Sequence, residues 1–555
     1  MRRLYTLSFL PLWFLFWAIT LVLYGIAWRS GFERDFHGWF EMFYNYSFAD
    51  CMNRKGMGIT SLYQVTQFQL WVWTKFFGTR LLPWFLLQTG LYAAAAALLT
   101  NFLGKFYADF GWKRALPIAF WGGVFSLVAP HNAEVAVWKA SYHYPVAILF
   151  FSGILLLFRR AARTGASGAV VFAVVLYAFS TFTLELFYAT LPMTFLLVLS
   201  YARQGRLRLR ARKSIVFGLT MMGLLFVAHF LLYNRVFNGF IPHQQGIIFI
   251  FLKDPVKGFG HFLQNEFHLL LQGRYWPQAW HSLLYKIALS YPGGVASILF
   301  LGGAMLYTGK AVLRRPAAAP LFWVTTAAVI GSLLIVSVWV SDLGLYHNDR
   351  LLYFTGLFQW QLVAMLLVRL KARPAVSFSL LLAALLSALT LYTALQLRRS
   401  AKIFWRVMDD FRWKDYTQSP VILLNVPANY KGIVIYQESP QFSELNSHLQ
   451  IYRSDSARQH PQVVAGYNME DTADGARVLM ESDTSLYVTL IRPGLWYWNG
   501  SLGASNHENE LYRMELDEWS HQYRMTLKDT SALLLYFNRG RWHEVDKSIR
   551  NAEQE

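Results

Sequence analysis

The chain has 555 residues and a formal net charge of +19, and its composition is 55% hydrophobic and only 15% charged. Soluble domains usually carry about 25% charged residues, so this balance excludes an ordinary soluble protein and a disordered chain. The long apolar runs also argue against a nucleic-acid partner, because such a protein gathers its positive charge on one soluble surface. A single cysteine, Cys51, excludes an intrachain disulfide.

Eleven apolar runs are predicted to cross a membrane as helices, which takes about 20 residues each. The first run is too long for the core of a signal peptide, so we interpret it as a retained transmembrane helix. The stretch Gly165–Ala202 holds one charge, Glu185, and we expect two short helices that meet near it. The predicted helices are Tyr5–Trp28, Leu81–Gly104, Ala115–Pro130, Ala140–Phe158, Ser167–Leu184, Leu186–Ala202, Ser214–Asn234, Ile287–Gly309, Pro316–Ser341, Leu351–Val368 and Pro374–Leu397.

The loops between these runs alternate in charge. With the N-terminus in the cytoplasm, the cytoplasmic loops hold 20 Lys and Arg but one acid, Asp109, and the other side holds 31 basic and 31 acidic residues. Because positively charged loops stay in the cytoplasm, this asymmetry predicts a multi-pass protein of the inner (plasma) membrane. The odd number of helices places the C-terminal region outside, in the periplasm or the extracellular space.

Three predicted outer segments are long: Arg29–Arg80, Val236–Lys286 and the tail from Arg398 onward. The second is rich in Phe, Leu and Trp, which is typical of interfacial helices that lie on a membrane.

The tail has the pattern of a β-rich domain. Ser419–Tyr436 is predicted to form a strand, a turn and a second strand, and Ser485–Ile491 and Ala532–Phe537 are further strand candidates. Glu508–Trp519 fits a short helix or a strand. We therefore expect a mainly α polytopic membrane domain, residues 1–400, followed by a small β-rich extracytoplasmic domain, residues 401–555.

No motif typical of soluble enzymes is present, so the candidate site residues are polar clusters on the predicted outer side. The first cluster, Glu33-Arg34-Asp35, follows the first helix. A carboxylate at a helix end is partly desolvated, which raises its pKa toward that of a general base. From the spacing alone, however, a solvated loop acid beside Arg34 is favoured over a general base.

The second cluster is a short outer hairpin that starts at Pro130 and places two His, one Glu and one Lys within a few residues. His and Glu side chains can bind a divalent metal, but no spacing here specifies one. Orienting a hydroxyl group is an equal alternative, and a polar hairpin that faces water is the simplest one. The polar residues of this hairpin are His131, Glu134, Lys139 and His143.

Two further clusters complete the set. A buried Glu185 would be costly and by default marks a functional site, although a position at the outer surface strengthens a purely structural interpretation. Asp349-Arg350, at the start of a predicted helix, is suited to binding a phosphate, and a local ion pair explains it equally well.

The order of these clusters resembles that in polytopic GT-C superfamily glycosyltransferases, of the bacterial protein O-mannosyltransferase-like kind. Arg34, Leu184 and Leu351 depart from the family's usual residues at their positions. The segments that carry the resemblance are Asp35 with Glu33 nearby, Gln67–Asn101, His131–Trp138, Thr183-Leu184-Glu185 with Leu191-Pro192, Asn348–Tyr353 and the tail segment Asn425–Tyr436.

The resemblance implies an enzyme that moves a sugar from a polyprenyl-phosphate donor to an acceptor hydroxyl of a glycan, lipid or protein at the outer face of the membrane. Asp35 would be the base of an inverting displacement, with Glu134 and Glu185 as further catalytic residues. Glu134, Glu185 and His143 would orient hydroxyls of the acceptor or the sugar, or hold an optional divalent metal ion. Substrate-binding residues would be Glu33, His131, Lys139, His143, Asp349 and Arg350, the last on the lipid phosphate.

Three other functions stay open. An O-antigen polymerase or ligase would use Val236–Lys286 as its active loop, with His268 and Arg274. A lipid or glycan transporter (a flippase) would show ionisable residues deep in its helices and helices broken at the midplane. A non-catalytic scaffold for the outer domain would need far fewer helices than eleven.

Overall fold

The structure, a computed structural model, describes residues 8–30, 36–53, 62–237, 291–338, 349–411, 419–431, 433–436, 438–439, 442–453, 461–492, 494–496, 506–518, 522–547 and 553–554. The chain divides into two compact units. The first comprises Met1–Ile26, Phe48–Trp73 and Leu82–Ala394, and the second comprises Ala27–Ser47, Thr74–Leu81 and Leu395–Glu555. Each unit is described by itself.

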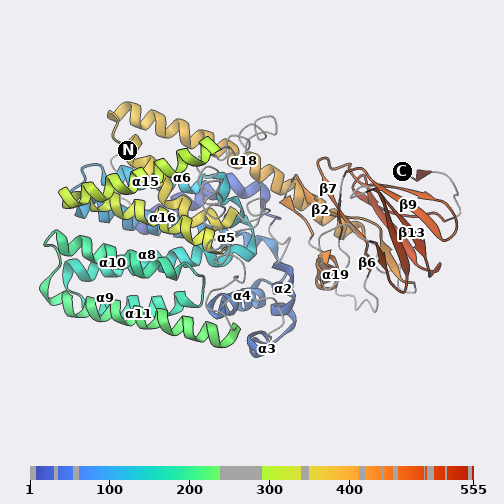
Figure 1. Cartoon of the computed structure of the whole chain (residues 1–555), viewed down its shortest axis with the longest axis horizontal. Helices are drawn as coiled ribbons and strands as arrows, with labels where there is room; N and C mark the ends of the chain where they lie inside the picture. Colours follow the sequence, from blue (N-terminus) through green and yellow to red (C-terminus); the bar gives the residue numbers. More distant parts are fainter. Residues whose placement is uncertain are drawn as a thin grey trace. The chain divides into compact units, whose positions relative to one another are not determined.

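Helices make up the described part of the first unit (Figure 1). α8, α9, α10 and α11 lie side by side, and α17 packs against both α6 and α16. Long elements in this part of the chain are α1 (Phe9–Tyr24), α4 (Gln64–Phe77), α5 (Leu81–Asp109), α6 (Ala115–Leu127), α8 (His143–Thr164), α9 (Ser167–Thr181), α10 (Phe187–Arg203), α11 (Leu209–Phe237), α15 (Tyr291–Arg314), α16 (Ala319–Val338), α17 (Tyr353–Leu367) and α18 (Ala372–Asp410). The short elements are η2 (Gly25–Ala27), α3 (Phe48–Asn53), η3 (Pro130–Asn132), α7 (Ala133–Val137), η4 (Lys139–Tyr142), η6 (Pro316–Ala318) and η7 (Asp349–Leu352). The helix α2 (Phe36–Asn45) belongs to the second unit.

Five described helical segments are long and apolar enough to cross a membrane: Phe9–Ala27, Leu81–Asp109, Lys139–Thr164, Leu209–Phe237 and Ala372–Asp410. Shorter apolar helices lie at Ala115–Leu127, Ser167–Thr181, Pro316–Gly331 and Tyr353–Leu367. The predicted division of the Gly165–Ala202 stretch is confirmed, because α9 ends before Glu185 and α10 begins after it. The count of eleven transmembrane helices and the orientation of the chain stay predictions.

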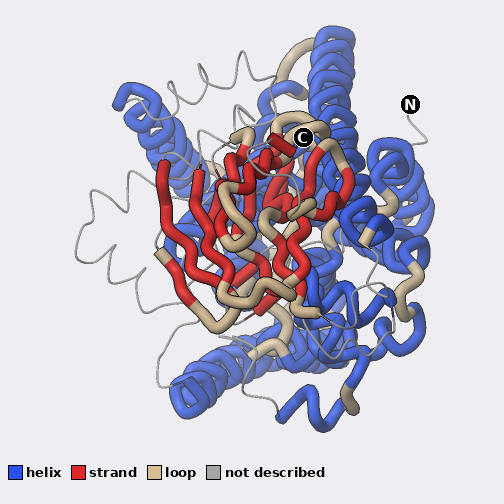
Figure 2. Tube along the Cα trace, turned by 90° about the vertical axis from the view of Figure 1, so that its right-hand side faces the viewer, coloured by secondary structure: helices blue, strands red, loops and turns tan. Residues whose placement is uncertain are grey.

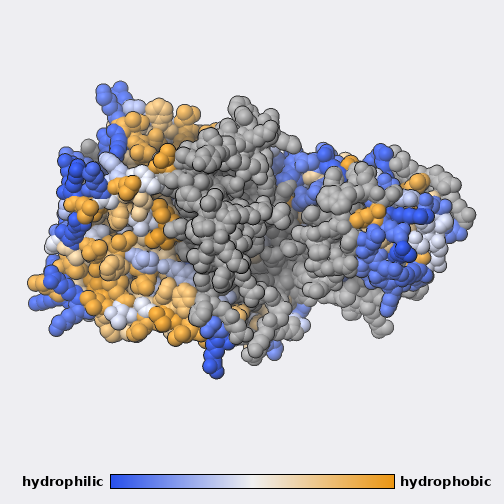
Figure 3. Space-filling view, in the orientation of Figure 1, coloured by the Kyte–Doolittle hydropathy of each residue, from blue (hydrophilic) through white to orange (hydrophobic). Residues whose placement is uncertain are grey.

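Large apolar side chains face outward along several of these helices. Phe172 on α9 is 55% exposed, Leu231 on α11 is 62% exposed and Leu381 on α18 is 66% exposed. Figure 3 shows apolar side chains gathered over the helices of this unit, with hydrophilic ones at the left-hand helix ends. A soluble protein rarely exposes so large an apolar area, whereas lipid chains cover such a surface without cost.

Glycines let α17 approach its neighbours closely. A Cβ at Gly331 of α16 would lie 2.6 Å from Oγ1 of Thr355 on α17, and a Cβ at Gly122 of α6 would overlap the side chain of Gln361. Small residues at helix contacts are typical of helix packing in membranes. The absence of these two side chains therefore fixes where α17 lies.

The second unit carries the described strands (Figure 2). Two four-stranded sheets have the orders β15-β14-β1-β6 and β10-β7-β2-β3, a six-stranded sheet has the order β11-β12-β13-β9-β8-β16, and β4 pairs with β5. The strands are β1 (Val421–Leu423), β2 (Val426–Tyr430), β3 (Ile433–Val434), β4 (Glu438–Ser439), β5 (Phe442–Ser443), β6 (Gln462–Val463), β7 (Ala465–Met469), β8 (Ala476–Met480), β9 (Ser485–Leu490), β10 (Gly494–Trp496), β11 (His507–Glu508), β12 (Tyr512–Glu518), β13 (Gln522–Leu527), β14 (Leu533–Asn538), β15 (Arg541–Glu544) and β16 (Glu553–Gln554). One helix, α19 (Glu444–Arg453), lies among them.

The strand predictions for the tail are confirmed in kind. β9 and β14 match two of the predicted strands, and Glu508–Trp519, left open between helix and strand, contains strand β12. The predicted strand-turn-strand over Ser419–Tyr436 forms three strands, of which β1 pairs in parallel with β14 and β6 rather than with β2. Asn425, between β1 and β2, exchanges two hydrogen bonds with the backbone of Phe537, at 2.7 and 2.8 Å, and so directs the chain from one sheet to the next.

Asp474 holds the turn between β7 and β8. Its carboxylate accepts hydrogen bonds from the backbone N–H groups of Glu470 and Asp471, at 2.8 and 2.9 Å, and from Nε of Arg492 at 2.8 Å. Burial alone would raise the pKa of this carboxyl, but the two N–H groups and the guanidinium outweigh it and hold the pKa below the ordinary value of 3.8.

We expect Asp474→Asn to destabilise the full-length protein at pH 7 by about 1–2 kcal/mol, since charge-assisted hydrogen bonds are lost. A carboxyl whose folded pKa is lowered stabilises the fold above its ordinary pKa and loses that contribution as the pH falls through the folded value. The difference in unfolding temperature between the two proteins should therefore shrink below about pH 4. Glu510→Gln, at an exposed position, is the control, and equal unfolding temperatures at pH 7 would contradict the assignment.

Candidate functional site

Between α6 and α8 the chain forms a compact hairpin of η3, α7 and η4. The side chain of Asn132 donates to the carbonyl of Ser126 at 2.7 Å, and the hydroxyl of Ser141 donates to the carbonyl of Trp138 at 2.7 Å. From α5, the amide of Gln88 donates to the carbonyl of Val135 at 2.6 Å. These buried bonds fix the backbone from which Glu134 and Trp138 project.

The central interaction of the site joins this hairpin to η7, more than two hundred residues later. Arg350 Nη1 donates to Glu134 Oε1 at 3.0 Å, and the backbone N–H of Arg350 donates to Oε2 at 3.2 Å. The guanidinium carbon lies 4.6 Å from the ring centre of Trp138, which adds a cation–π contact. Arg350 is thus held at both its guanidinium and its backbone by one carboxylate, and its guanidinium also lies over an aromatic ring.

The ion pair is largely removed from solvent. The side chain of Arg350 is 18% exposed and that of Glu134 is 14% exposed. Removing one partner from a buried pair costs about 3–5 kcal/mol, because the other charge stays buried. This pair therefore keeps the hairpin and η7 together.

A second acid lies in the same region. The hydroxyl of Tyr63 donates to both oxygens of Glu185, at 2.8 and 2.9 Å, and Glu185 is 8% exposed. Tyr144, near the start of α8, lies close enough to Arg350, Glu134 and Glu185 to interact with all three electrostatically. Tyr144 therefore places the two acids and the arginine in one neighbourhood.

The turn that carries Glu185 is hydrogen-bonded to the first turn of α4. The backbone N–H of Val65 donates to the carbonyl of Phe182 at 3.0 Å, and the hydroxyl of Thr66 donates to the carbonyl of Thr183 at 2.9 Å. These bonds also bring Tyr63 to Glu185. The helix break at the one charged residue of a long apolar run is thus a built feature of the site.

The structure brings together four of the predicted site residues. Glu134, Arg350 and Glu185 are linked as described, and the ring of His143 lies 5.6 Å from that of Tyr63. Their roles in catalysis or binding stay predictions.

The other predicted residues lie in the same short elements or are not described. His131 is fully buried and packs against Gly356 on α17, and the ammonium of Lys139 donates to the carbonyl of Val137 at 2.8 Å. Asp349 begins η7. Glu33 and Asp35 lie outside the described residues.

Sequence reasoning missed Tyr63 and Tyr144. Neither stands out in a chain with 30 tyrosines, and neither belongs to a charged cluster. The adjacency of Tyr144 to His143 was the one available signal. Among the described residues, no group of three or more His, Cys, Asp and Glu could hold a metal ion.

No protein-family model matches the chain, and no curated protein matches it. Among solved structures, ArnT from Cupriavidus metallidurans in the apo state is 14% identical over 81% of this chain and 85% of that chain, with a TM-score of 0.36. The same protein bound to undecaprenyl phosphate is 14% identical over 81% of this chain and 85% of that chain, with a TM-score of 0.34. Values this low transfer neither a function nor a ligand to this chain.

Gly356→Ala tests how the hairpin depends on α17. A Cβ at Gly356 would overlap Nε2 of the buried His131, so we expect a loss of about 1–3 kcal/mol from overpacking. The measurement is the thermal unfolding midpoint of the purified full-length protein in detergent. Gly223→Ala on α11 is the matched control, because no atom lies within 4 Å of a Cβ there. Equal midpoints for the two variants would refute the close contact.

Proposed function

We propose that the protein is a membrane glycosyltransferase that moves a sugar from a polyprenyl-phosphate donor to an acceptor hydroxyl. The observation that carries the proposal is the position of Arg350, held by Glu134 and Trp138 and neighboured by Tyr144 and Glu185. A lipid phosphate and a sugar need a cation and hydroxyl-binding groups close together, and this neighbourhood offers both.

Arg350 would bind the phosphate of the donor. A guanidinium has five N–H donors in a planar fork, so it can contact phosphate oxygens while it keeps its bond to Glu134. Glu134 and the ring of Trp138 hold the guanidinium in place before the donor arrives. A preorganised cation stabilises the negative charge that develops on the leaving phosphate at little reorganisation cost.

Glu185 and Tyr63 would orient hydroxyl groups of the sugar or the acceptor. A carboxylate accepts hydrogen bonds from hydroxyls, and the tyrosine can donate to a substrate oxygen in place of the acid. His143, whose ring lies against Tyr63, is a further candidate for this role. Lys139, His131 and Asp349 stay proposed substrate-binding residues on the sequence resemblance alone.

Asp35 would act as the base, as the resemblance implies, with Glu33 close by in sequence. It would take the proton of the acceptor hydroxyl while that oxygen attacks the anomeric carbon. The bond from the anomeric carbon to the phosphate oxygen breaks, and the polyprenyl phosphate leaves with the electron pair. A single displacement of this kind inverts the anomeric centre. The reaction would take place at the outer face of the inner membrane, on a glycan, lipid or protein acceptor.

The location of the charged residues favours this function over transport. Glu134, Glu185 and Arg350 lie in short elements or turns between the long helices, rather than midway along a described apolar helix. Transporters instead place ionisable residues and broken helices at the bilayer midplane. A polymerase or ligase would rely on Val236–Lys286, of which residues 238–286 lie outside the described residues.

Arg350→Ala should lower kcat/KM for the polyprenyl-phosphate sugar roughly 10- to 100-fold, the effect of losing charge-assisted hydrogen bonds. Arg350→Lys should recover little of the lost kcat/KM, because an ammonium lacks the planar arrangement of donors that a guanidinium has. Arg315→Ala removes an exposed arginine from the loop before α16 and serves as the control. Unchanged kcat and KM in Arg350→Ala would remove the phosphate role.

Asp35→Asn should lower the transfer rate about 10²- to 10⁴-fold while expression stays normal, because a general base contributes that much. Glu33→Gln is the matched comparison in the same cluster: Glu33 is proposed to bind substrate and not to take the proton, so its loss should raise KM and leave most of kcat intact. The assay follows release of polyprenyl phosphate. Full activity in Asp35→Asn would overturn the assignment of the base.

A further inference from the structure

A basic cavity lies at the other end of α8 from the candidate site. Its volume is about 620 Å³, and it is lined by three helix segments that end or begin together. These are the C-terminal ends of α5 and α8 and the approach to α11. The basic residues of its lining are Lys105, Arg159, Arg160, Arg163 and Arg208.

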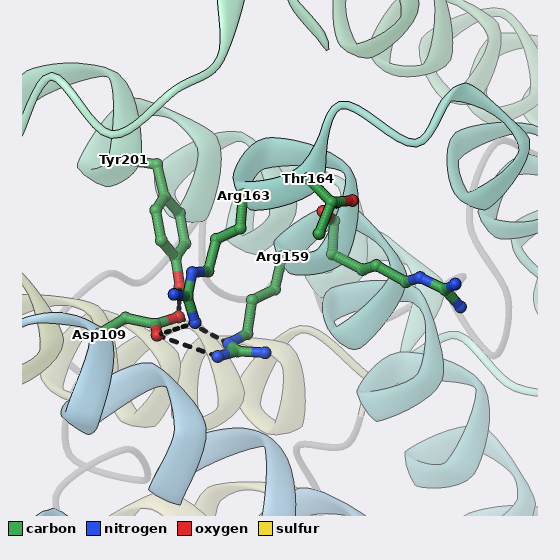
Figure 4. A network of polar contacts seen from close by, with 6 residues as sticks. Asp109, Arg159, Arg163, Thr164 and Tyr201 are labelled. Atoms are coloured by element: carbon green, nitrogen blue, oxygen red, sulfur yellow. Dashed lines mark hydrogen bonds and ion pairs between the residues drawn. The ribbon is translucent and has the colours of Figure 1, made fainter.

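One acid balances only part of the positive charge of this cavity. Asp109, at the end of α5, binds Arg159 through Nε and Nη2 at 2.7 and 2.9 Å and Arg163 through Nη1 at 2.7 Å (Figure 4). The hydroxyl of Tyr201 donates to the same carboxylate at 2.5 Å. One buried carboxylate thus orders two arginines, and none of the residues that line the cavity is acidic.

Backbone geometry keeps these arginines together. α8 ends at Thr164 and is followed by Gly165, which adopts a left-handed conformation with φ of 81° and whose N–H donates to the carbonyl of Ala161 at 2.8 Å. The backbone N–H of Arg208 donates to the carbonyl of Ala162 at 3.2 Å, which ties the approach to α11 onto the last turn of α8. The fold therefore fixes the backbone that carries these arginines, while the side chains of Arg160, Arg163 and Arg208 are exposed.

We propose that this cavity binds the phosphate group of an anionic phospholipid. Arginines in an ordered cluster are suited to phosphate, and basic pockets between the ends of membrane helices are suited to lipid head groups. Leu156 and Leu157 on α8 also line the cavity, so its wall has an apolar part beside the basic one. A lipid fits both parts, because its phosphate meets the arginines while its chains lie on the apolar surface. This site is separate from the proposed catalytic residues and does not depend on the proposed function.

The test uses Arg160→Gln/Arg208→Gln in the full-length protein, which removes two lining charges and leaves the Asp109 network intact. Arg206→Gln/Arg212→Gln is the matched control, with the same change in charge at exposed positions outside the cavity. Each protein is purified in mild detergent, delipidated and titrated with phosphatidylglycerol, phosphatidylcholine or inorganic phosphate. The readouts are lipid bound per protein and the thermal unfolding midpoint.

We expect phosphatidylglycerol to bind the wild type and the control equally and to bind the cavity variant roughly tenfold more weakly. Phosphatidylglycerol should raise the unfolding midpoint of the wild type and the control only, and phosphatidylcholine should give a smaller rise in those two proteins. Equal phosphatidylglycerol binding by all three proteins would overturn the site. If inorganic phosphate alone raised the unfolding midpoint as much as phosphatidylglycerol does, the proposal that the bound phosphate belongs to a lipid would be overturned.

Discussion

The first unit depends on one constraint, which is that a carboxylate removed from water must find donors within the protein. Glu134, Glu185 and Asp109 are each largely buried, and each is held by a different kind of partner. Arg350 neutralises the first, a tyrosine hydroxyl serves the second and two arginines surround the third. Because an unpaired buried charge costs several kcal/mol, each acid dictates which distant segment lies beside it. The turns and helix ends are arranged around these three requirements.

The bond from Glu134 to Arg350 shows how such a requirement builds a site. It joins two short elements far apart in sequence, and it can form only if α17 lies close to α6 and α16. Gly122 and Gly331 permit that approach, since a Cβ at either position would overlap a side chain of α17. The ion pair with Glu134 and the close packing of α17 thus both favour the same position for Arg350. The proposed phosphate contact relies on that agreement, because a loosely held arginine would lose part of its binding energy to ordering.

The sequence was most informative where a local signal existed. A single charge inside a long apolar run located the break at Glu185, and short runs rich in strand-forming residues located β9 and β14. Pairing between distant segments leaves no periodic signal, so neither the contact of Tyr63 with Glu185 nor the parallel pairing of β1 with β14 could be predicted. The candidate residues of the hairpin were identified by type, but the sequence could not separate Glu134, which faces Arg350, from Lys139, whose ammonium bonds its own hairpin.

α8 begins at His143, beside the candidate site, and ends at Thr164, beside the basic cavity. Its 22 residues form one rod of about 33 Å, close to the thickness of the apolar core of a bilayer. A tilt of this rod at one end therefore displaces the other end as well. A ligand at one end of α8 that favours a given tilt changes the affinity of the other end for its ligand. By thermodynamic reciprocity, the second ligand changes the affinity for the first by the same factor. With the two proposed sites at its ends, α8 would thereby couple a lipid bound at the basic cavity to the reaction at the other end of the helix.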